Sequence, residues 1–99
     1  MNEIKKAKLD KYFSTTEQAI KDAQKNLTKA KGVCINLDDI AKEFLEVAKN
    51  YFSDAKHFQK KGDGITAFAA LNYAHGWLDA GVKLGLFKVK DSKLFAYVE

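Results

Sequence analysis

The sequence of 99 residues has no arginine, no proline and a single cysteine. Average usage of about 5% predicts roughly five prolines in a chain of this length, so their absence favours long helices. Cys34 cannot form a disulfide within the chain, which indicates a reducing compartment such as the cytoplasm. There is no run of 18 apolar residues, and no signal-peptide core follows the lysine-rich start. We therefore expect neither a membrane span nor export.

The composition is typical of one ordinary globular domain. Hydrophobic residues make up 46% of the chain and charged residues 30%, which is too apolar for a disordered protein and too polar for a membrane protein. A chain of this length fits a single domain, residues 1–99, and can bury a core without metals or disulfides.

The positive charge is concentrated at the start of the chain. All 17 basic residues are lysines, and residues 1–31 hold eight of them against four acids, which accounts for the net charge of +4. A basic helix can attract phosphate groups, whereas the absence of arginine removes the planar donor fork favoured for bidentate phosphate contacts. A solvated lysine face is the simpler interpretation. The nucleic-acid alternative would use Lys11, Lys21, Lys25 and Lys29, together with Lys42, Lys49, Lys56 and Lys60.

Apolar residues at steps of three and four predict two long helices in the first two thirds of the chain. The first is expected over about residues 5–31, with Gly32 as its C-terminal cap. The second is expected over about residues 38–61, with Asn36 or Asp38 as the N-cap.

A third and more apolar helix is predicted over about residues 65–84. Gly62-Asp63-Gly64 interrupts the chain before it, Asp63 can cap it, and Gly85 ends it. Apolar residues cover well over half of its circumference, so we expect it at the centre of a bundle or in an oligomer interface.

The tail, residues 86–99, holds two apolar segments, 86–89 and 94–98, separated by an Asp91-Ser92 turn signal. We expect these segments to pack across the bundle or against a partner chain. A short hairpin formed by the two segments is an alternative conformation. The predicted fold is all-α, a three-helix antiparallel bundle with a short packed C-terminal tail.

Catalytic and cofactor motifs are missing from the sequence. There is no H-E-x-x-H, paired-cysteine metal spacing, Walker loop, Rossmann glycine pattern or G-x-S-x-G. Gly62-Asp63-Gly64 is too short for a phosphate cradle, and Cys34 has no histidine near it in sequence. We therefore expect no cofactor, no metal and no catalytic residue, and Cys34 is interpreted as a small structural residue.

One group of polar residues is a candidate binding site. If the second and third helices form an antiparallel hairpin about Asp63, residues equidistant from it meet, and a polar patch forms along their seam. A His–Asp pair beside a tyrosine could support acid–base chemistry or hold a metal, and the simpler interpretation is mutual hydrogen bonding at the border of the core. The patch would consist of Tyr51, Asp54, Asn72, His75 and Asp79.

The second half of the chain resembles a known family. The segments that carry the resemblance are Tyr51-Phe52-Ser53-Asp54-Ala55, Lys61-Gly62-Asp63, AFAALNYAHGWLDA from Ala67 to Ala80, and GVKLGLF from Gly81 to Phe87. Together they are similar to a small archaeal family, domain of unknown function 357, over about residues 50–87. The resemblance implies a cytoplasmic three-helix protein and no activity, cofactor or catalytic residue.

Three functions remain open on the sequence alone. The leading hypothesis is a non-enzymatic protein-interaction module that binds a protein partner or self-associates through the third helix and the tail. The alternatives are nucleic-acid binding through the lysine face and a small-ligand or enzyme site at the seam of the second and third helices.

Overall fold

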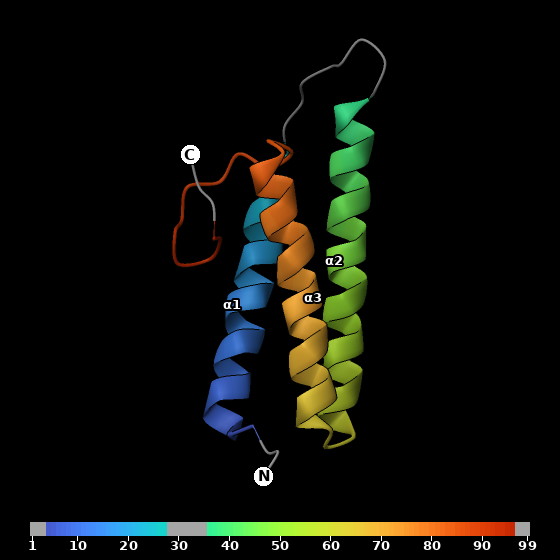
Figure 1. Ribbon diagram of the computed structural model, residues 1–99, viewed down its shortest axis with the longest axis vertical. Coiled ribbons are helices and arrows are strands. Elements are labelled where there is room, and N and C mark those ends of the chain that lie inside the picture. Colours follow the sequence, from blue (N-terminus) through green and yellow to red (C-terminus); the bar gives the residue numbers. More distant parts are fainter. Residues whose placement is uncertain (1–3, 28–35, 97–99) are drawn as a thin grey trace.

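The computed structural model describes residues 4–27 and 36–96, and it holds three helices within them (Figure 1). They are α1, Lys6–Lys25; α2, Leu37–Lys60; and α3, Gly64–Lys83. Consecutive helices run in opposite directions and form a rod of 50 × 22 × 20 Å. The described ranges contain no strand beyond one isolated bridge between Leu27 and Phe87. The predicted all-α three-helix bundle is confirmed.

The starts of α2 and α3 are determined by local capping. The Asn36 side chain accepts hydrogen bonds from the backbone N–H groups of Asp38 and Asp39, at 3.1 and 3.4 Å. The Asp63 carboxylate accepts one from the N–H of Thr66 at 3.0 Å. These bonds satisfy N–H groups that have no partner within the helix, and they place both helix starts one residue before the predicted positions.

Two glycines allow the backbone to leave helical geometry. Gly62 and Gly85 have φ angles of +80° and +78°, in the left-handed region that residues with a Cβ rarely adopt. Gly62 lies in the turn between α2 and α3, and Gly85 lies just after α3. Both were predicted at these positions.

The prediction that the first helix continues to residue 31 is wrong. It ends at Lys25, and the Asn26 side chain donates to the carbonyl and the carboxylate of Asp22, at 2.7 and 2.8 Å. The Asn26 carbonyl then accepts a hydrogen bond from the N–H of Lys88 at 3.0 Å, and Leu27 pairs with Phe87. The expected cap Gly32 and residues 28–31 of the expected helix lie outside the described residues.

The tail packs on its own bundle. Leu86, Phe87, Val89 and Phe95 are all at most 3% exposed, and they join the core formed by the three helices. The N–H of Leu94 donates to the Asp91 carbonyl and the N–H of Lys93 to the Asp91 carboxylate, which forms the predicted turn. The hairpin does not form within the described residues, because Phe87 pairs with Leu27 of the α1 end and not with the second half of the tail.

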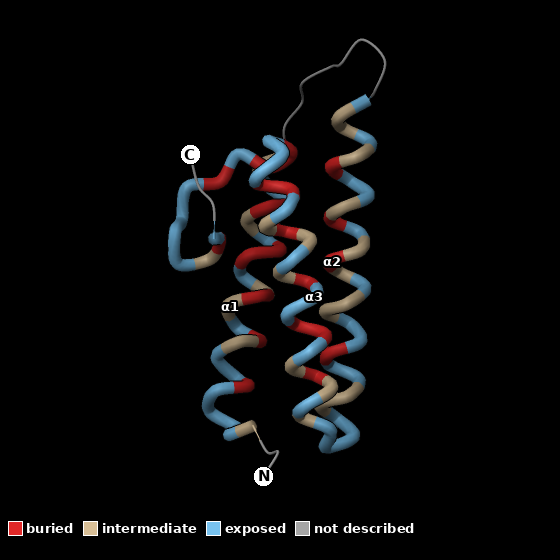
Figure 2. Tube along the Cα trace, in the orientation of Figure 1, coloured by how far each residue is buried: buried red, intermediate tan, exposed pale blue. Residues whose placement is uncertain are grey.

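Helix α3 is the central helix of the bundle, with one face left uncovered. It has its most extensive contact with α2, and α1 packs more closely on α3 than on α2. Leu71 and Leu78 are fully buried in the two parts of the core. Exposed stretches nevertheless recur along α3 between the buried ones (Figure 2). The apolar composition of α3 predicted that the helix would be buried on nearly all sides. In the single chain, one face of α3 remains exposed.

Candidate functional site

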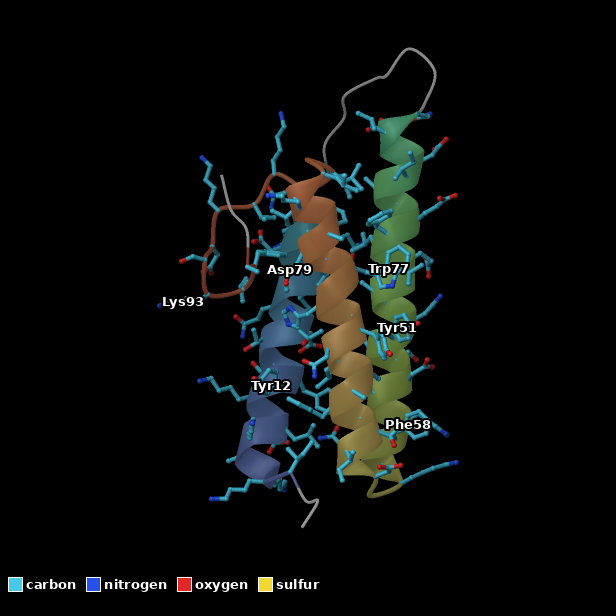
Figure 3. The ribbon with its side chains drawn as sticks, viewed as in Figure 1. Tyr12, Tyr51, Phe58, Trp77, Asp79 and Lys93 are labelled. Carbon is cyan, nitrogen blue, oxygen red and sulfur yellow. The ribbon has the colours of Figure 1, made fainter. Side chains whose placement is uncertain are left out.

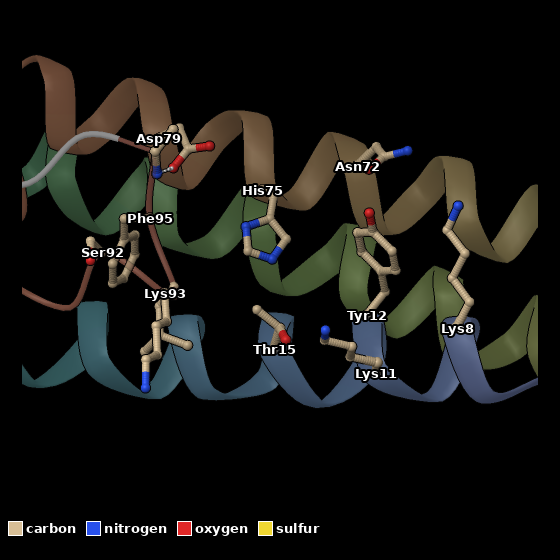
Figure 4. Close-up of a pocket in the computed structure, with 12 residues that line it drawn as sticks. Lys8, Lys11, Tyr12, Thr15, Asn72, His75, Asp79, Ser92, Lys93 and Phe95 are labelled. Carbon is tan, nitrogen blue, oxygen red and sulfur yellow. Dashed lines mark hydrogen bonds between the residues drawn. The ribbon is translucent and has the colours of Figure 1, made fainter.

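A cavity of about 570 Å³ lies between α1, α3 and the tail. It contains three of the predicted site residues, Asn72, His75 and Asp79, on the side of α3 that faces α1 (Figure 4). The His75 ring extends from α3 toward α1 above Thr15, and the Tyr12 hydroxyl points up toward α3. The remaining walls come from Lys8, Lys11, Ser92, Lys93, Leu94, Phe95 and Ala96.

Burial controls the ionisation of His75. Desolvation of the half-buried ring lowers the pKa of His75 below its ordinary value, and the nearby Asp79 carboxylate offsets part of this effect. The imidazole is therefore neutral at pH 7, with one ring nitrogen able to donate a hydrogen bond and the other able to accept one.

Asp79 is a structural residue in this arrangement. Its carboxylate accepts a hydrogen bond from the backbone N–H of Ala96 at 2.9 Å and so ties the tail to α3. The side chains of Tyr12, Asn72 and His75 have no hydrogen-bond partner among the described residues. The cavity therefore offers polar groups to a small ligand, with ammonium groups of Lys8, Lys11 and Lys93 on its walls.

The predicted seam patch does not assemble as expected. Tyr51 and Asp54 do not line the cavity; the Tyr51 ring stacks on Tyr73, with centroids 5.3 Å apart, and Asp54 is exposed. Figure 3 shows Tyr51 on the α2 side of α3 and Asp79 on the side of the tail. Equal distance from Asp63 predicts that Tyr51 lies beside His75, whereas Tyr51 stacks on Tyr73, two residues earlier. His75 points to α1, so the patch divides between two sides of α3.

The cavity residues that were not predicted from the sequence come from α1 and the tail. No functional prediction was made for Tyr12, and its ring meets Phe68 edge to face, with centroids 4.7 Å apart. The apolar segments of the tail were the available signal that residues 92–96 would cover part of the bundle. Their position over His75 depends on the early end of α1, which the sequence pattern did not indicate.

The other candidates have simpler surroundings. Lys11, Lys21 and Lys25 are exposed on α1, while Lys29 and Cys34 lie outside the described residues. His57 is exposed on α2 and does not line the cavity around His75. Nucleic-acid binding stays a prediction.

A second feature is the exposed face of α3 together with its C-cap residue, which we call the α3 face; it is defined by Ile65, Ala69, Tyr73, Gly76, Ala80 and Leu84. In the described chain, the exposed large hydrophobic side chains are Ile65, Tyr73 and Leu84, with 48%, 62% and 65% of their surfaces accessible. All three lie on this face, and Ala69, Gly76 and Ala80 between them are also exposed.

A shallow hollow of about 310 Å³ opens on the same face. Gly76 and Ala80 lie along it, and Phe44 of α2 and Trp77 of α3 contribute rings that meet edge to face at 4.9 Å. Asn72 and Tyr73 complete its rim. The hollow is thus mostly apolar and borders the exposed Tyr73 ring.

Within the described ranges, no group of three or more His, Cys, Asp or Glu side chains is arranged to hold a metal ion. In the same ranges, no helix combines the length and the apolar character needed to cross a bilayer.

The sequence matches the family described as "Protein of unknown function (DUF357)" over residues 11–87. The chain belongs to this family. No curated protein and no solved structure matches it. The DUF357 segment contains all of α2, all of α3 and the exposed α3 face, and it ends at Phe87. The tail residues that wall the His75 cavity, 92–96, follow the DUF357 segment.

Proposed function

We propose that this protein is a non-enzymatic helical interaction module that self-associates through the exposed face of α3. The observation that carries the proposal is the gathering of Ile65, Tyr73 and Leu84 on a single helix face. Singly scattered apolar side chains are normal on a protein surface, whereas a continuous apolar stripe is typical of a contact surface.

The tail is not part of this surface. From the sequence, the interaction was predicted to involve the third helix together with the tail, but Phe87 and Phe95 are buried in their own bundle. The proposal therefore rests on α3 and the adjoining rings of α2.

The available area fits a weak dimer. α3 has 20 residues, and a helix of that length is about 30 Å long and about 10–12 Å wide with its side chains. A contact along this face would bury on the order of 300–400 Å² per copy, which is in the range of weak, transient interfaces. We expect a dissociation constant in the micromolar range, since modest area limits the affinity.

Sedimentation equilibrium with the matched variants Ala80→Glu and Ala7→Glu tests this proposal. Both alanines are exposed on helices, but only Ala80 lies on the α3 face. We expect Ala80→Glu to weaken the dimer about 100-fold, because each dimer would bury two unpaired carboxylates at about 1–3 kcal/mol each, and 1.4 kcal/mol is tenfold in affinity.

Ala7→Glu is expected to dimerise like the unaltered chain, and both variants should retain their helical circular dichroism. A chain that stays monomeric at several hundred micromolar would contradict the proposal. Equal dimerisation of the two variants would show that α3 is not the contact surface.

A further inference from the structure

We infer that the α3 face pairs with the same face of a second copy, antiparallel, about a two-fold axis that passes between Ala74 and His75. This inference rests on the proposed self-association and adds the direction and register of the pair. Three features favour this pair: the order of side chains along the face, their sizes and the hollow beside Tyr73.

The six positions of the face have the same spacing in both directions. A two-fold interface requires that if residue i contacts residue j of the partner, residue j contacts residue i. At 100° per residue, all six positions lie within about 50° of the centre of the face. The intervals are four, four, three, four and four residues, through Ile65, Ala69, Tyr73, Gly76, Ala80 and Leu84.

The side chains that this symmetry brings together are complementary in size. Ile65 faces Leu84 of the second copy at each end of the contact. Ala69 faces Ala80, and two small residues allow the backbones to approach closely. Tyr73, the largest residue of the face, is opposite Gly76, which has no side chain.

The hollow provides space for the Tyr73 ring of the second copy. Gly76 and Ala80 lie along it, the rings of Phe44 and Trp77 line it, and its volume is about 310 Å³. Tyr73 is held outward by its stack on Tyr51. An aromatic ring that is already oriented loses little conformational freedom on binding, which is typical of anchor residues.

A parallel pair would not match these features. It would place Tyr73 against Tyr73 and Gly76 against Gly76, so that two rings collide beside an unfilled gap. The antiparallel pair also aligns the two α3 dipoles favourably. None of the six positions carries a charge, and the exposed Lys83, at the same angle as Ile65, adds one charge at the edge of the face. The six positions themselves fit an uncharged surface such as their own.

Disulfide trapping tests the register. In a Cys34→Ser background, one chain carries Ala69→Cys and a second, mass-tagged chain carries Ala80→Cys; each is oxidised alone and as an equal mixture. A disulfide needs Cα atoms about 4.4–6.8 Å apart. Identical positions of an antiparallel pair are 11 residues apart along the axis, about 16 Å, whereas positions 69 and 80 are opposite each other.

We expect the mixture to form the tagged–untagged disulfide dimer and each chain alone to form almost none. With random mixing, about half of the dimers pair the two chain types, which limits the yield. Dimers trapped by each chain alone would indicate a parallel pair and overturn the register. Dimerisation in sedimentation with no trapping in any sample would also overturn it, while leaving self-association in place. If the background chain is monomeric in sedimentation, the proposed function itself fails.

Discussion

His75 is the side chain whose chemistry depends most on its surroundings. Its ring is half-buried between α3 and α1 and has no hydrogen-bond partner among the described residues. The ionisable groups around the cavity are Asp79 of α3, Lys8, Lys11 and Tyr12 of α1, and Lys93 of the tail. Burial lowers the pKa of His75, and one carboxylate does not compensate for the lost hydration.

The lowered pKa predicts a pH dependence of stability. Between the folded and unfolded pKa values the unfolded chain binds more protons, so the free energy of unfolding falls as the pH drops through the ordinary histidine range. Stability is restored as the pH rises above the unfolded value. Urea unfolding between pH 7.5 and 5 should show this loss in the unaltered chain and a smaller loss in His75→Gln.

The exposed His57 provides the control for this measurement. The loss of stability in His57→Gln should match that of the unaltered chain. If His75→Gln and the unaltered chain show the same pH dependence, the ring is not desolvated as described.

On the scale of one element, two glycines of α3 differ in what surrounds them. A Cβ on Gly81 would overlap the ring of Phe87, whereas a Cβ on Gly76 would meet nothing within 4 Å. Gly81 therefore permits the tail to dock on α3, and Gly76 lies in open space on the exposed face. The same residue type has a packing role in one place and leaves the surface free in the other.

Opposite effects are predicted for alanine at these two positions. Gly81→Ala should lower the free energy of unfolding by about 1–3 kcal/mol, because the core must shift to accept the added methyl group. Gly76→Ala should raise it by about 0.5–1 kcal/mol through better helix propensity. Urea titrations in the Ala80→Glu background measure both effects on the monomer. A destabilising Gly76→Ala would mean that this face is covered within a single chain.

Local sequence signals correctly predicted where two of the helices begin. Asn36 and Asp63 determine the starts of α2 and α3 by bonds to N–H groups two or three residues away, so the sequence pattern located both to within one residue. The end of α1 was missed, because the Asn26 carbonyl pairs with Lys88, which is distant in sequence. The apolar periodicity up to residue 30 does not contain that contact.

On the scale of the whole molecule, self-association should make thermal stability depend on concentration. A partner that binds only the folded chain raises the free energy of unfolding by mass action. The Tm of the unaltered chain should therefore rise by several degrees between concentrations below and far above the dissociation constant. The Tm of Ala80→Glu should stay constant over the same range, as calorimetry can show; a constant Tm for both would argue against a dimer.

The candidate sites were only partly predictable, because each depends on which neighbours cover α3. The sequence placed Asn72, His75 and Asp79 on one side of the helix, and the structure keeps them together. It paired them with Tyr51 and Asp54, which lie on the α2 side, because helical periodicity does not determine which neighbour a given side faces. The exposed α3 face was not predicted, for the same reason. An apolar composition suggests that a helix is buried, but it does not show which neighbouring element or chain covers each side.

By itself, the sequence determined that this chain forms long helices, where α2 and α3 begin, and where glycine ends the helical geometry. These features depend on contacts within a few residues. The tertiary structure decided the end of α1, the docking of the tail, the cavity around His75 and the uncovered face of α3. Each of these is set by the packing of segments far apart in sequence, and burial is a property of the assembled bundle.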